Sequence, residues 1–255
     1  SLNSDSNTKI TENNKSRNHT ENMLLENSKA IKIKGKLKRK INIFGKKYLN
    51  SIKINVPNDP SSAAFFSALT LLNKNSSIKI RNVGLNPTRT GFYQLLKKQG
   101  AKIKFVNLKK NNNELRGDII VKYCKLKPIT ASKEYYVNST DEYPILFVIA
   151  ALIKGTSTFK GISDLANKES NRTVEMQKIL HQVNVKTKLL RDGLKIYGRG
   201  IFDASNKTIN VPSLGDHRIC MSTFVLALLT GAKTKIKNFD TVFTSSPSFL
   251  QIMKK

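Results

Sequence analysis

Three apolar helical segments, each led by an aspartate, recur along the chain and constrain its fold more than any other feature. They read Asp59-Pro-Ser-Ser-Ala-Ala-Phe-Phe-Ser-Ala-Leu-Thr-Leu-Leu72, Asp141-Glu-Tyr-Pro-Ile-Leu-Phe-Val-Ile-Ala-Ala-Leu-Ile153 and Asp216-His-Arg-Ile-Cys-Met-Ser-Thr-Phe-Val-Leu-Ala-Leu-Leu229. An aspartate before an apolar run is typical of a helix N-terminus, and proline in the first turn strengthens that pattern. Because the segments are apolar almost all round, we expect three buried helices.

The sequence after each of these helices also repeats. Each is followed by a strand, predicted at 77–81, 156–160 and 234–237. A loop then leads to an amphipathic helix, predicted at 91–97, 174–183 and 248–253. The first two units add a pair of strands, at 101–106 with 118–123 and at 185–189 with 194–198. The third unit has no such pair.

The repeat predicts an α/β (α+β) fold in which βαβαββ units pack around buried parallel helices. Three units fill residues 58–255, and residues 1–57 match only the second half of a unit. In that first part, a helix is expected from Ser16, and alternating isoleucines at 31–33 and 41–43 predict a hairpin. Ile52, Ile54 and Val56 predict a third strand. A chain that begins in the middle of a unit is expected to be the later part of a longer protein.

The strong positive charge raises the question of a nucleic-acid partner. The chain has 45 basic and 17 acidic residues, a formal net charge of +28. Only nine of the basic residues are arginine, the lysines are scattered, and aromatic residues make up 7% without a tryptophan. Nucleic-acid readers use arginine pairs and stacked aromatic rings. We therefore read the charge as favouring small anionic ligands, and we do not expect nucleic acid as a partner.

Other features of the composition bear on the compartment. Cys124 and Cys220 form neither a disulfide framework nor a metal-ligand spacing, which suits a reducing compartment. No apolar run approaches the roughly 20 residues that span a bilayer. We expect a cytoplasmic protein with no membrane partner and no metal.

The stretch Lys168-Glu-Ser-Asn-Arg172 is the first candidate site. A helix places Lys168 and Arg172 on one face, with Glu169 beside them. Free N–H groups at a helix N-terminus already favour anions. The stretch therefore resembles an anion site with a titratable acid next to it, although a solvated charged turn would have the same sequence.

The starts of the buried helices supply further candidates. Asp141 and Glu142 begin the second helix, and Gly215-Asp-His-Arg218 begins the third. Each aspartate alone would be read as an N-cap. Arg218 opposes the helix dipole at its position, which suggests that a bound anion compensates it. If the units pack about a pseudo-threefold axis, these helix starts meet Lys168 and Arg172 at one end of the domain.

Seven stretches, in order, resemble the EPSP synthase (3-phosphoshikimate 1-carboxyvinyltransferase) family. They are Ser16-Arg-Asn-His-Thr-Glu-Asn-Met-Leu24, Val56-Pro-Asn-Asp-Pro-Ser-Ser-Ala-Ala-Phe-Phe66, Asn82-Val-Gly-Leu-Asn-Pro-Thr-Arg-Thr-Gly91, Asp141-Glu-Tyr-Pro-Ile145, Lys168-Glu-Ser-Asn-Arg172, Gly215-Asp-His-Arg218 and Thr244-Ser-Ser-Pro-Ser-Phe249. The resemblance implies two domains of βαβαββ units with the active site in the cleft between them. Residues 1–57 would end the N-terminal, shikimate 3-phosphate domain, and residues 58–255 would form the C-terminal domain on the phosphoenolpyruvate side.

The resemblance also implies the reaction. Members transfer the enolpyruvyl group of phosphoenolpyruvate to the 5-hydroxyl of shikimate 3-phosphate by addition and elimination, releasing phosphate and using no cofactor. Both substrates carry phosphate and carboxylate groups, so cation clamps and positioned acids and bases are needed. We expect a monomer when the protein is full length. The family's N-terminal phosphate motifs have no counterpart here, so this chain alone is expected to be inactive.

The resemblance assigns roles to residues that match the motifs. Phosphoenolpyruvate would be held by Lys168, Arg172 and Arg218, with Lys168 also placed for proton transfer. Glu169 would act as acid or base at the enol methylene, and His217 would support the phosphoenolpyruvate end.

Four residues would contact shikimate 3-phosphate, namely Ser16, Arg17, Asp141 and Lys168. Asp141 would also accept the hydrogen bond of the attacking hydroxyl and act as its base.

Two departures and two alternatives accompany this reading. Ala166 and Asn167 stand where the family commonly has Arg-Val, and Asn171 stands where it has Asp. A related enolpyruvyl transferase acting on a UDP-sugar is one alternative, although Asp-His-Arg together with Lys-Glu-Ser-x-Arg argues against it. An inactive basic fragment that binds anions or nucleic acid is the other.

Overall fold

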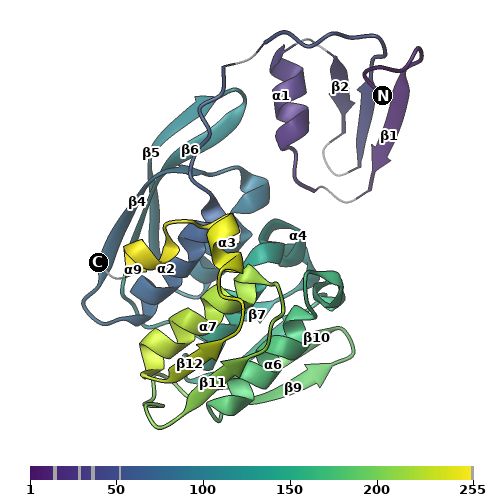
Figure 1. The fold of residues 1–255 in the computed structure, drawn as a ribbon. Coiled ribbons are helices and arrows are strands. Elements are labelled where there is room, and N and C mark those ends of the chain that lie inside the picture. Colours follow the sequence, from purple (N-terminus) through teal and green to yellow (C-terminus); the bar gives the residue numbers. More distant parts are fainter. Residues whose placement is uncertain (14–15, 28–29, 36–37, 52, 254–255) are drawn as a thin grey trace.

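The computed structural model describes residues 1–13, 16–27, 30–35, 38–51 and 53–253. They form two bodies joined by an extended linker (Figure 1). The smaller one, here the N-terminal body, is a three-stranded antiparallel sheet with one helix. Its elements are β1 (Thr8–Glu12), α1 (His19–Asn27), β2 (Ile31–Lys34) and β3 (Arg39–Ile43), in the sheet order β1-β3-β2.

The predicted hairpin is confirmed, but the prediction of a third strand at Ile52, Ile54 and Val56 is wrong. β2 pairs with β3 in register from Ile31 opposite Ile43. Residues 53–57 form no strand, and Ile52 lies outside the described residues. Val56 is 78% exposed and Ile54 is also exposed, because this segment crosses between the bodies where no partner strand runs beside it. The alternating apolar pattern therefore marks a linker.

The larger one, here the repeat body, contains the three predicted units. The first has α2 (Pro60–Leu72), β4 (Ser77–Gly84), α3 (Gly91–Lys98), β5 (Lys102–Asn111) and β6 (Glu114–Lys122), with the antiparallel sheet order β4-β6-β5. An isolated parallel bridge between Asn58 and Val83 stands where a full unit has its first strand.

The second unit has the complete set of elements. They are β7 (Thr130–Ala131), α4 (Tyr136–Ser139), α5 (Tyr143–Ala151), β8 (Gly155–Lys160), α6 (Arg172–Gln182), β9 (Lys186–Leu190) and β10 (Gly193–Gly198). Its sheet has the order β7-β8-β10-β9. Single 3₁₀ turns, η3 (Thr140–Glu142) and η4 (Ser163–Asn167), precede α5 and α6.

The third unit is shorter. It has β11 (Thr208–Val211), α7 (His217–Thr230), β12 (Lys233–Ile236), α8 (Thr241–Ser245) and α9 (Phe249–Met253), and β11 pairs with β12 in parallel. Gly231, with φ +72°, ends α7 in the left-handed conformation that favours glycine.

The three buried helices α2, α5 and α7 form the core of the repeat body and run in parallel. All nine residues of α5 are buried. At one end, Ser61 at the start of α2 bonds Glu142 before α5. At the other end, Leu72, Ile153 and Leu229 line one open cavity of about 760 Å³. The α+β class and the packing of repeated units around parallel helices are as the sequence predicted.

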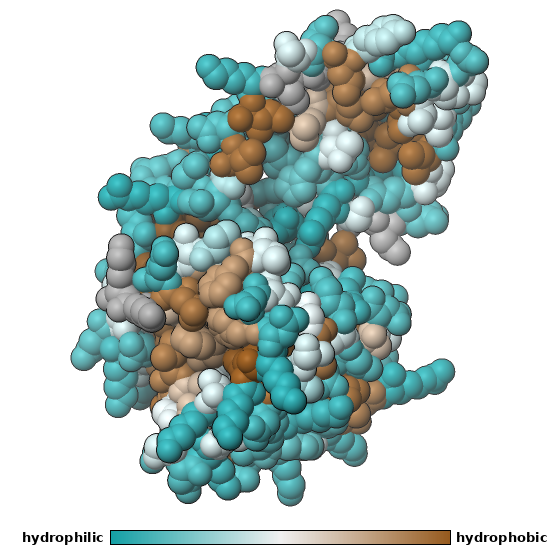
Figure 2. Space-filling model, viewed as in Figure 1, coloured by the Kyte–Doolittle hydropathy of each residue, from teal (hydrophilic) through white to brown (hydrophobic). Residues whose placement is uncertain are grey.

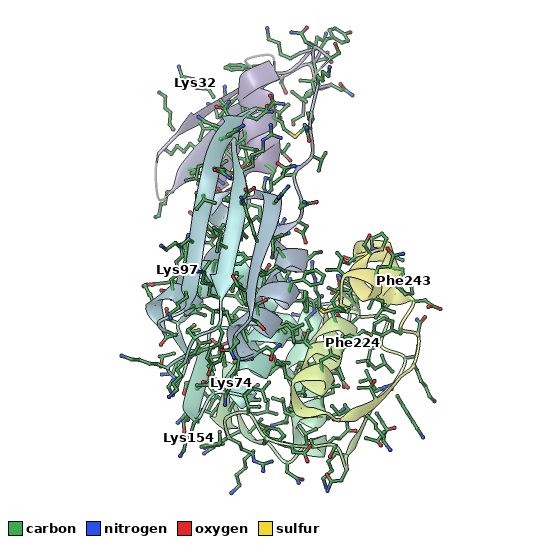
Figure 3. The ribbon with its side chains drawn as sticks, turned by 90° about the vertical axis from the view of Figure 1, so that its left-hand side faces the viewer. Lys32, Lys74, Lys97, Lys154, Phe224 and Phe243 are labelled. Carbon is green, nitrogen blue, oxygen red and sulfur yellow. The ribbon has the colours of Figure 1, made fainter. Side chains whose placement is uncertain are left out.

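The surface bears on the alternatives raised by composition. An apolar area lies over α7 and α9 (Figure 2), where Leu228 and Ile252 are exposed. Lys32 on β2, Lys97 on α3 and the loop residues Lys74 and Lys154 lie along one side of the molecule (Figure 3). In the part of the chain that the structure describes, no helix is long and apolar enough to cross a membrane.

Candidate active site

The starts of α5, α6 and α7 meet at one end of the repeat body. Asp216 caps α7, where its carboxylate accepts from the backbone N–H groups of Arg218 at 3.0 Å and Ile219 at 3.4 Å. Asp216 is completely buried. A buried carboxylate needs compensating donors or cations, and here the second unit supplies a cation.

Arg172, the first residue of α6, is that cation. Its guanidinium donates from Nε to Asp216 Oδ2 at 2.9 Å and from Nη2 to Glu169 Oε2 at 2.5 Å. Its Nη1 lies 3.6 Å from Asp141 Oδ1. Although charged, Arg172 is only 1% exposed. A buried arginine among carboxylates from three segments joins the second and third units at this end.

Arg218, the second residue of α7, is a second buried guanidinium beside it. Its Nη2 lies 3.9 Å from Asp141 Oδ2, too far for a hydrogen bond. Within the described residues, Nε and Nη1 of Arg218 and Nη1 of Arg172 are buried without a hydrogen-bond partner. Three buried donor atoms on two cations therefore remain available to an acceptor.

Asp141 is not the cap of its helix, which corrects the expectation from the repeat. It lies in η3, and Glu142 occupies the N-cap position of α5 without a side-chain capping bond. Asp141 instead accepts from Arg17 Nη2 at 2.5 Å, across the gap between the two bodies. Burial raises the pKa of Asp141, but the positive charges of Arg218, Arg17 and Arg172 outweigh this effect. The net result is a pKa of about 2. The carboxylate is therefore ionised near neutral pH and can accept hydrogen bonds.

The other residues predicted for the phosphoenolpyruvate side lie around these arginines and are less buried than the arginines are. Lys168 is paired with Asp164 at 2.9 Å, not with the cluster. Glu169 has a side chain that is 48% exposed, so it can turn away from Arg172. His217 is half-buried; burial and the adjacent Arg218 lower its pKa, which favours the neutral imidazole.

Of the two residues predicted from the N-terminal body, one reaches the cluster. Arg17 does so through Asp141. The hydroxyl of Ser16 donates to Glu12 at 2.5 Å, within its own body. Asn171 caps α6 by accepting from Val174 N–H, so the departure from Asp keeps the cap.

Sequence reasoning missed a second, partly buried network beside Asp141. Arg89 Nη2 donates to Asp59 Oδ1 at 2.6 Å and to Ser61 Oγ at 2.9 Å, and Ser61 in turn donates to Glu142. A signal was present, because Arg89-Thr90 follows the strand of the first unit as Arg172-Thr173 follows that of the second. The two arginines bind the capping aspartates of α2 and α7, respectively.

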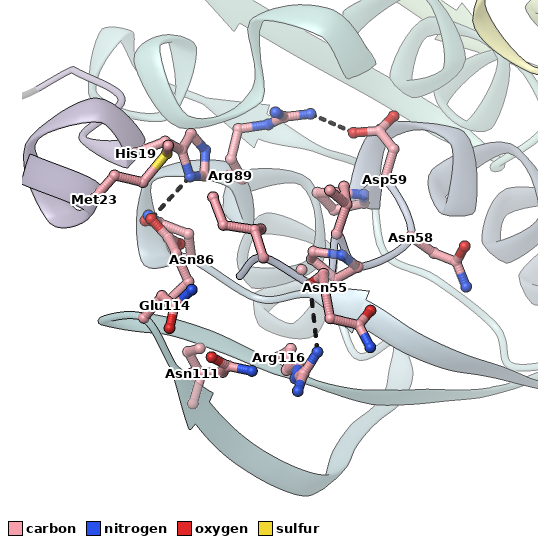
Figure 4. A pocket seen from close by; sticks show the side chains of 17 residues that line it. His19, Met23, Asn55, Asn58, Asp59, Asn86, Arg89, Asn111, Glu114 and Arg116 are labelled. Atoms are coloured by element: carbon pink, nitrogen blue, oxygen red, sulfur yellow. Dashed lines mark hydrogen bonds and ion pairs between the residues drawn. The ribbon is translucent and has the colours of Figure 1, made fainter. Parts of the chain in front are cut away.

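A cavity of about 470 Å³ adjoins this network where α1, the linker and the β5–β6 hairpin meet (Figure 4). On its wall, His19 Nδ1 lies 3.0 Å from Glu114, which also accepts from Asn22 and Asn86. These bonds tie α1 to the first unit.

Comparisons with known proteins agree on one family. The family model described as EPSP synthase (3-phosphoshikimate 1-carboxyvinyltransferase) matches residues 1–253. A 3-phosphoshikimate 1-carboxyvinyltransferase of Carboxydothermus hydrogenoformans is 40% identical over the whole of this chain and 58% of its own length. Another, of Persephonella marina, is 36% identical over 97% of this chain and 57% of its own length.

Solved structures show the same likeness. The EPSP synthase of Acinetobacter baumannii superposes with a TM-score of 0.86 at 32% identity, over 98% of this chain and 56% of that one. The enolpyruvyl transferase NikO of Streptomyces tendae has a TM-score of 0.70 at 12% identity over 96% of this chain and 54% of its own, which is a likeness of fold. The chain spans somewhat more than half the length of the relatives that it matches.

Proposed function

The chain belongs to the EPSP synthase family, and on that premise we propose that it forms the phosphoenolpyruvate side of an EPSP synthase. The whole enzyme would transfer the enolpyruvyl group of phosphoenolpyruvate to the 5-hydroxyl of shikimate 3-phosphate. In the addition step, the hydroxyl oxygen bonds to C2 of phosphoenolpyruvate, its proton passes to a base, and C3 gains a proton. In the elimination step, C3 loses a proton and the bond to the phosphate oxygen breaks, releasing inorganic phosphate.

The observation that carries the proposal is the pair of buried arginines with free donors. A buried polar group without a partner costs about 1–3 kcal/mol, and more if charged. In the described part of the chain, Arg172 and Arg218 keep three such nitrogens between them. Guanidinium groups bind phosphate and carboxylate through paired hydrogen bonds. A ligand with both groups, such as phosphoenolpyruvate, would satisfy these donors.

The acid–base assignments follow from the surroundings of each carboxylate. Asp141, ionised and close to both arginines, would accept the hydrogen bond of the attacking hydroxyl. Glu169, half-exposed and touching Arg172, would exchange the proton at C3. Lys168 would join the phosphoenolpyruvate clamp after leaving Asp164, and neutral His217 would support it.

The shikimate 3-phosphate side would be shared between the two bodies. Arg17 is already opposite Asp141, and Ser16 precedes it in the chain. We propose that both contact the substrate phosphate, together with Lys168. The same reading assigns residues 1–57 to the N-terminal domain and 58–255 to the C-terminal domain. Separate sheets on either side of the linker support this division. We also propose a cytoplasmic enzyme that is monomeric when whole.

Turnover tests the proposal. Residues 1–255 would be joined to the portion of the Carboxydothermus relative that they do not match, and phosphate release would be followed with both substrates. We expect release that depends on shikimate 3-phosphate and is absent with a UDP-sugar. Glu169→Gln should abolish turnover and retain phosphoenolpyruvate binding. Glu175→Gln is the matched control, because Glu175 lies on α6 but pairs with Lys178. Full turnover by Glu169→Gln would remove the assignment of Glu169.

A further inference from the structure

Three acidic residues occupy the N-cap positions of the buried helices, and one of them differs from the other two. Asp59 caps α2 and is paired with Arg89 at 2.6 Å. Asp216 caps α7 and is paired with Arg172 at 2.9 Å. Glu142 holds the same position on α5, makes no capping bond and, among the described residues, has no cation within ion-pair distance. Within the described part of the chain, it is the one capping acid of the three without a partner cation.

Glu142 is enclosed by groups from several neighbouring elements. It is 2% exposed and accepts a hydrogen bond from Ser61 Oγ on α2. Arg218 faces it from α7 and Arg89 from η1 (Pro87–Arg89). The remaining charged or titratable neighbours are Asp141 beside it in the chain, Tyr93 on α3 and Tyr143 on α5.

The form of Glu142 bears directly on Arg218. Arg218 is buried, and Asp141, at 3.9 Å, is its only ion-pair partner among the described residues. A neutral Glu142, bonded to Ser61, leaves that guanidinium available to a ligand anion. An ionised Glu142 adds a second negative charge next to Arg218 and competes with the ligand for the same cation.

Resting on the proposed function, we propose that Glu142 is a positioning residue that sets the affinity of Arg218 for the phosphoenolpyruvate anion. When Glu142 is neutral, Arg218 can bind the ligand anion. When Glu142 is ionised, its carboxylate competes with the ligand for Arg218 and weakens binding. Ser61 can donate to Oε1 of Glu142 in both forms, because the proton of the neutral acid can lie on Oε2. Because only the ionised form competes for Arg218, ligand binding favours the protonated form of Glu142.

The titration of Glu142 supports this assignment. Burial raises the pKa of Glu142 to about 7, and the charge on Asp141 contributes to the rise, while Ser61, Arg218 and Arg89 oppose it. The side chain thus changes protonation state near neutral pH. A ligand anion held by Arg218 would raise that pKa further, and binding should take up a proton.

Calorimetric titration of this chain with phosphoenolpyruvate tests the inference. If only the neutral form binds, the wild-type dissociation constant scales with the inverse of the neutral fraction. Relative to Glu142→Gln, wild type should bind equally at about pH 6 and about tenfold more weakly at about pH 8. The comparison at each pH cancels the titration of the ligand phosphate and of His217. Glu175→Gln should follow wild type.

A second variant keeps the test informative if Glu142→Gln does not fold. Ser61→Ala removes a bond that lowers the pKa of Glu142, so the loss of affinity should move to higher pH. Parallel pH curves for wild type, Glu142→Gln and Ser61→Ala would overturn the inference and leave the proposed function standing. No binding by wild type even at about pH 6 would overturn both, because Arg218 would then hold no ligand anion.

Discussion

Replacing Arg172 by methionine should destabilise the chain by about 3 kcal/mol. The substitution keeps an unbranched side chain of similar length but leaves Asp216 buried without its cation. Removing one partner of a buried ion pair typically costs about 3–5 kcal/mol. Asp216 keeps three other donors, Ser170 Oγ at 2.9 Å and two backbone N–H groups, which places the expected cost at the low end.

Substitution of the partner carboxylate, Asp216→Asn, should lower the free energy of unfolding by less. In Asp216→Asn the amide oxygen can still cap α7, and Arg172 keeps Glu169 and Asp141 as neighbours. We expect a loss of about 1–2 kcal/mol from the weakened bonds. The double variant removes both charges together, so it should cost less than the sum of the single losses by about 1–3 kcal/mol.

Urea unfolding, followed by far-ultraviolet circular dichroism near neutral pH, gives the free energy of unfolding of wild type, of the two single variants and of the double variant. The free energies of unfolding form a double-mutant cycle with Glu175→Gln as a control for removing a charge on α6. A cost below about 1 kcal/mol for Arg172→Met, or strict additivity in the double variant, would refute the reasoning that this pair is a buried and mutually dependent ion pair.

Three further predictions concern other parts of the molecule. The low pKa of Asp141 adds stability that is full above about pH 4 and is lost as the pH falls towards about 2, a loss of about 2 kcal/mol that Asp141→Asn should not show in acid unfolding. Phe249→Ala should cost about 3–5 kcal/mol in urea, because this buried ring from α9 packs on the core; a loss below about 1 kcal/mol would mean that α9 is not anchored there. Arg39→Met should speed amide exchange in β1, because Arg39 binds Glu12 and Glu21 from two segments of the N-terminal body, and unchanged exchange would show that these bonds do not hold that strand.

The elements that sequence predicted well are those whose burial is one-sided or complete. The helices α2, α5 and α7 are apolar throughout, so their existence follows from composition over a dozen residues. The predicted strand pairs have period-two patterns bounded by turn residues. By contrast, β7 has only two residues, too few for a period-two pattern to show, and the four-residue β11 was not predicted either.

Sequence predicted that Arg172 and Arg218 come together, but not the geometry around them. Both arginines are buried, while the anion site that the motifs at Lys168–Arg172 and Arg218 indicate stays a prediction. Sequence placed Asp141 in the capping position because its unit resembles the other two. A 3₁₀ turn shifts the cap to Glu142, and nothing local distinguishes these neighbouring acids. The bridge from Ser61 to Glu142 joins residues 81 positions apart, so only the packed units reveal it.

Phosphoenolpyruvate binding by Arg218→Gln tests whether the buried arginines hold the ligand. The variant keeps a polar side chain of similar shape but loses the cation and its free donors. We expect titration calorimetry near neutral pH to show affinity at least about tenfold weaker than wild type, since hydrogen bonds to charged groups contribute about 1.5–3 kcal/mol. Arg191→Gln, which removes an exposed arginine elsewhere, should bind as wild type does. Equal affinity in wild type and Arg218→Gln would contradict the claim that the buried arginines hold the ligand.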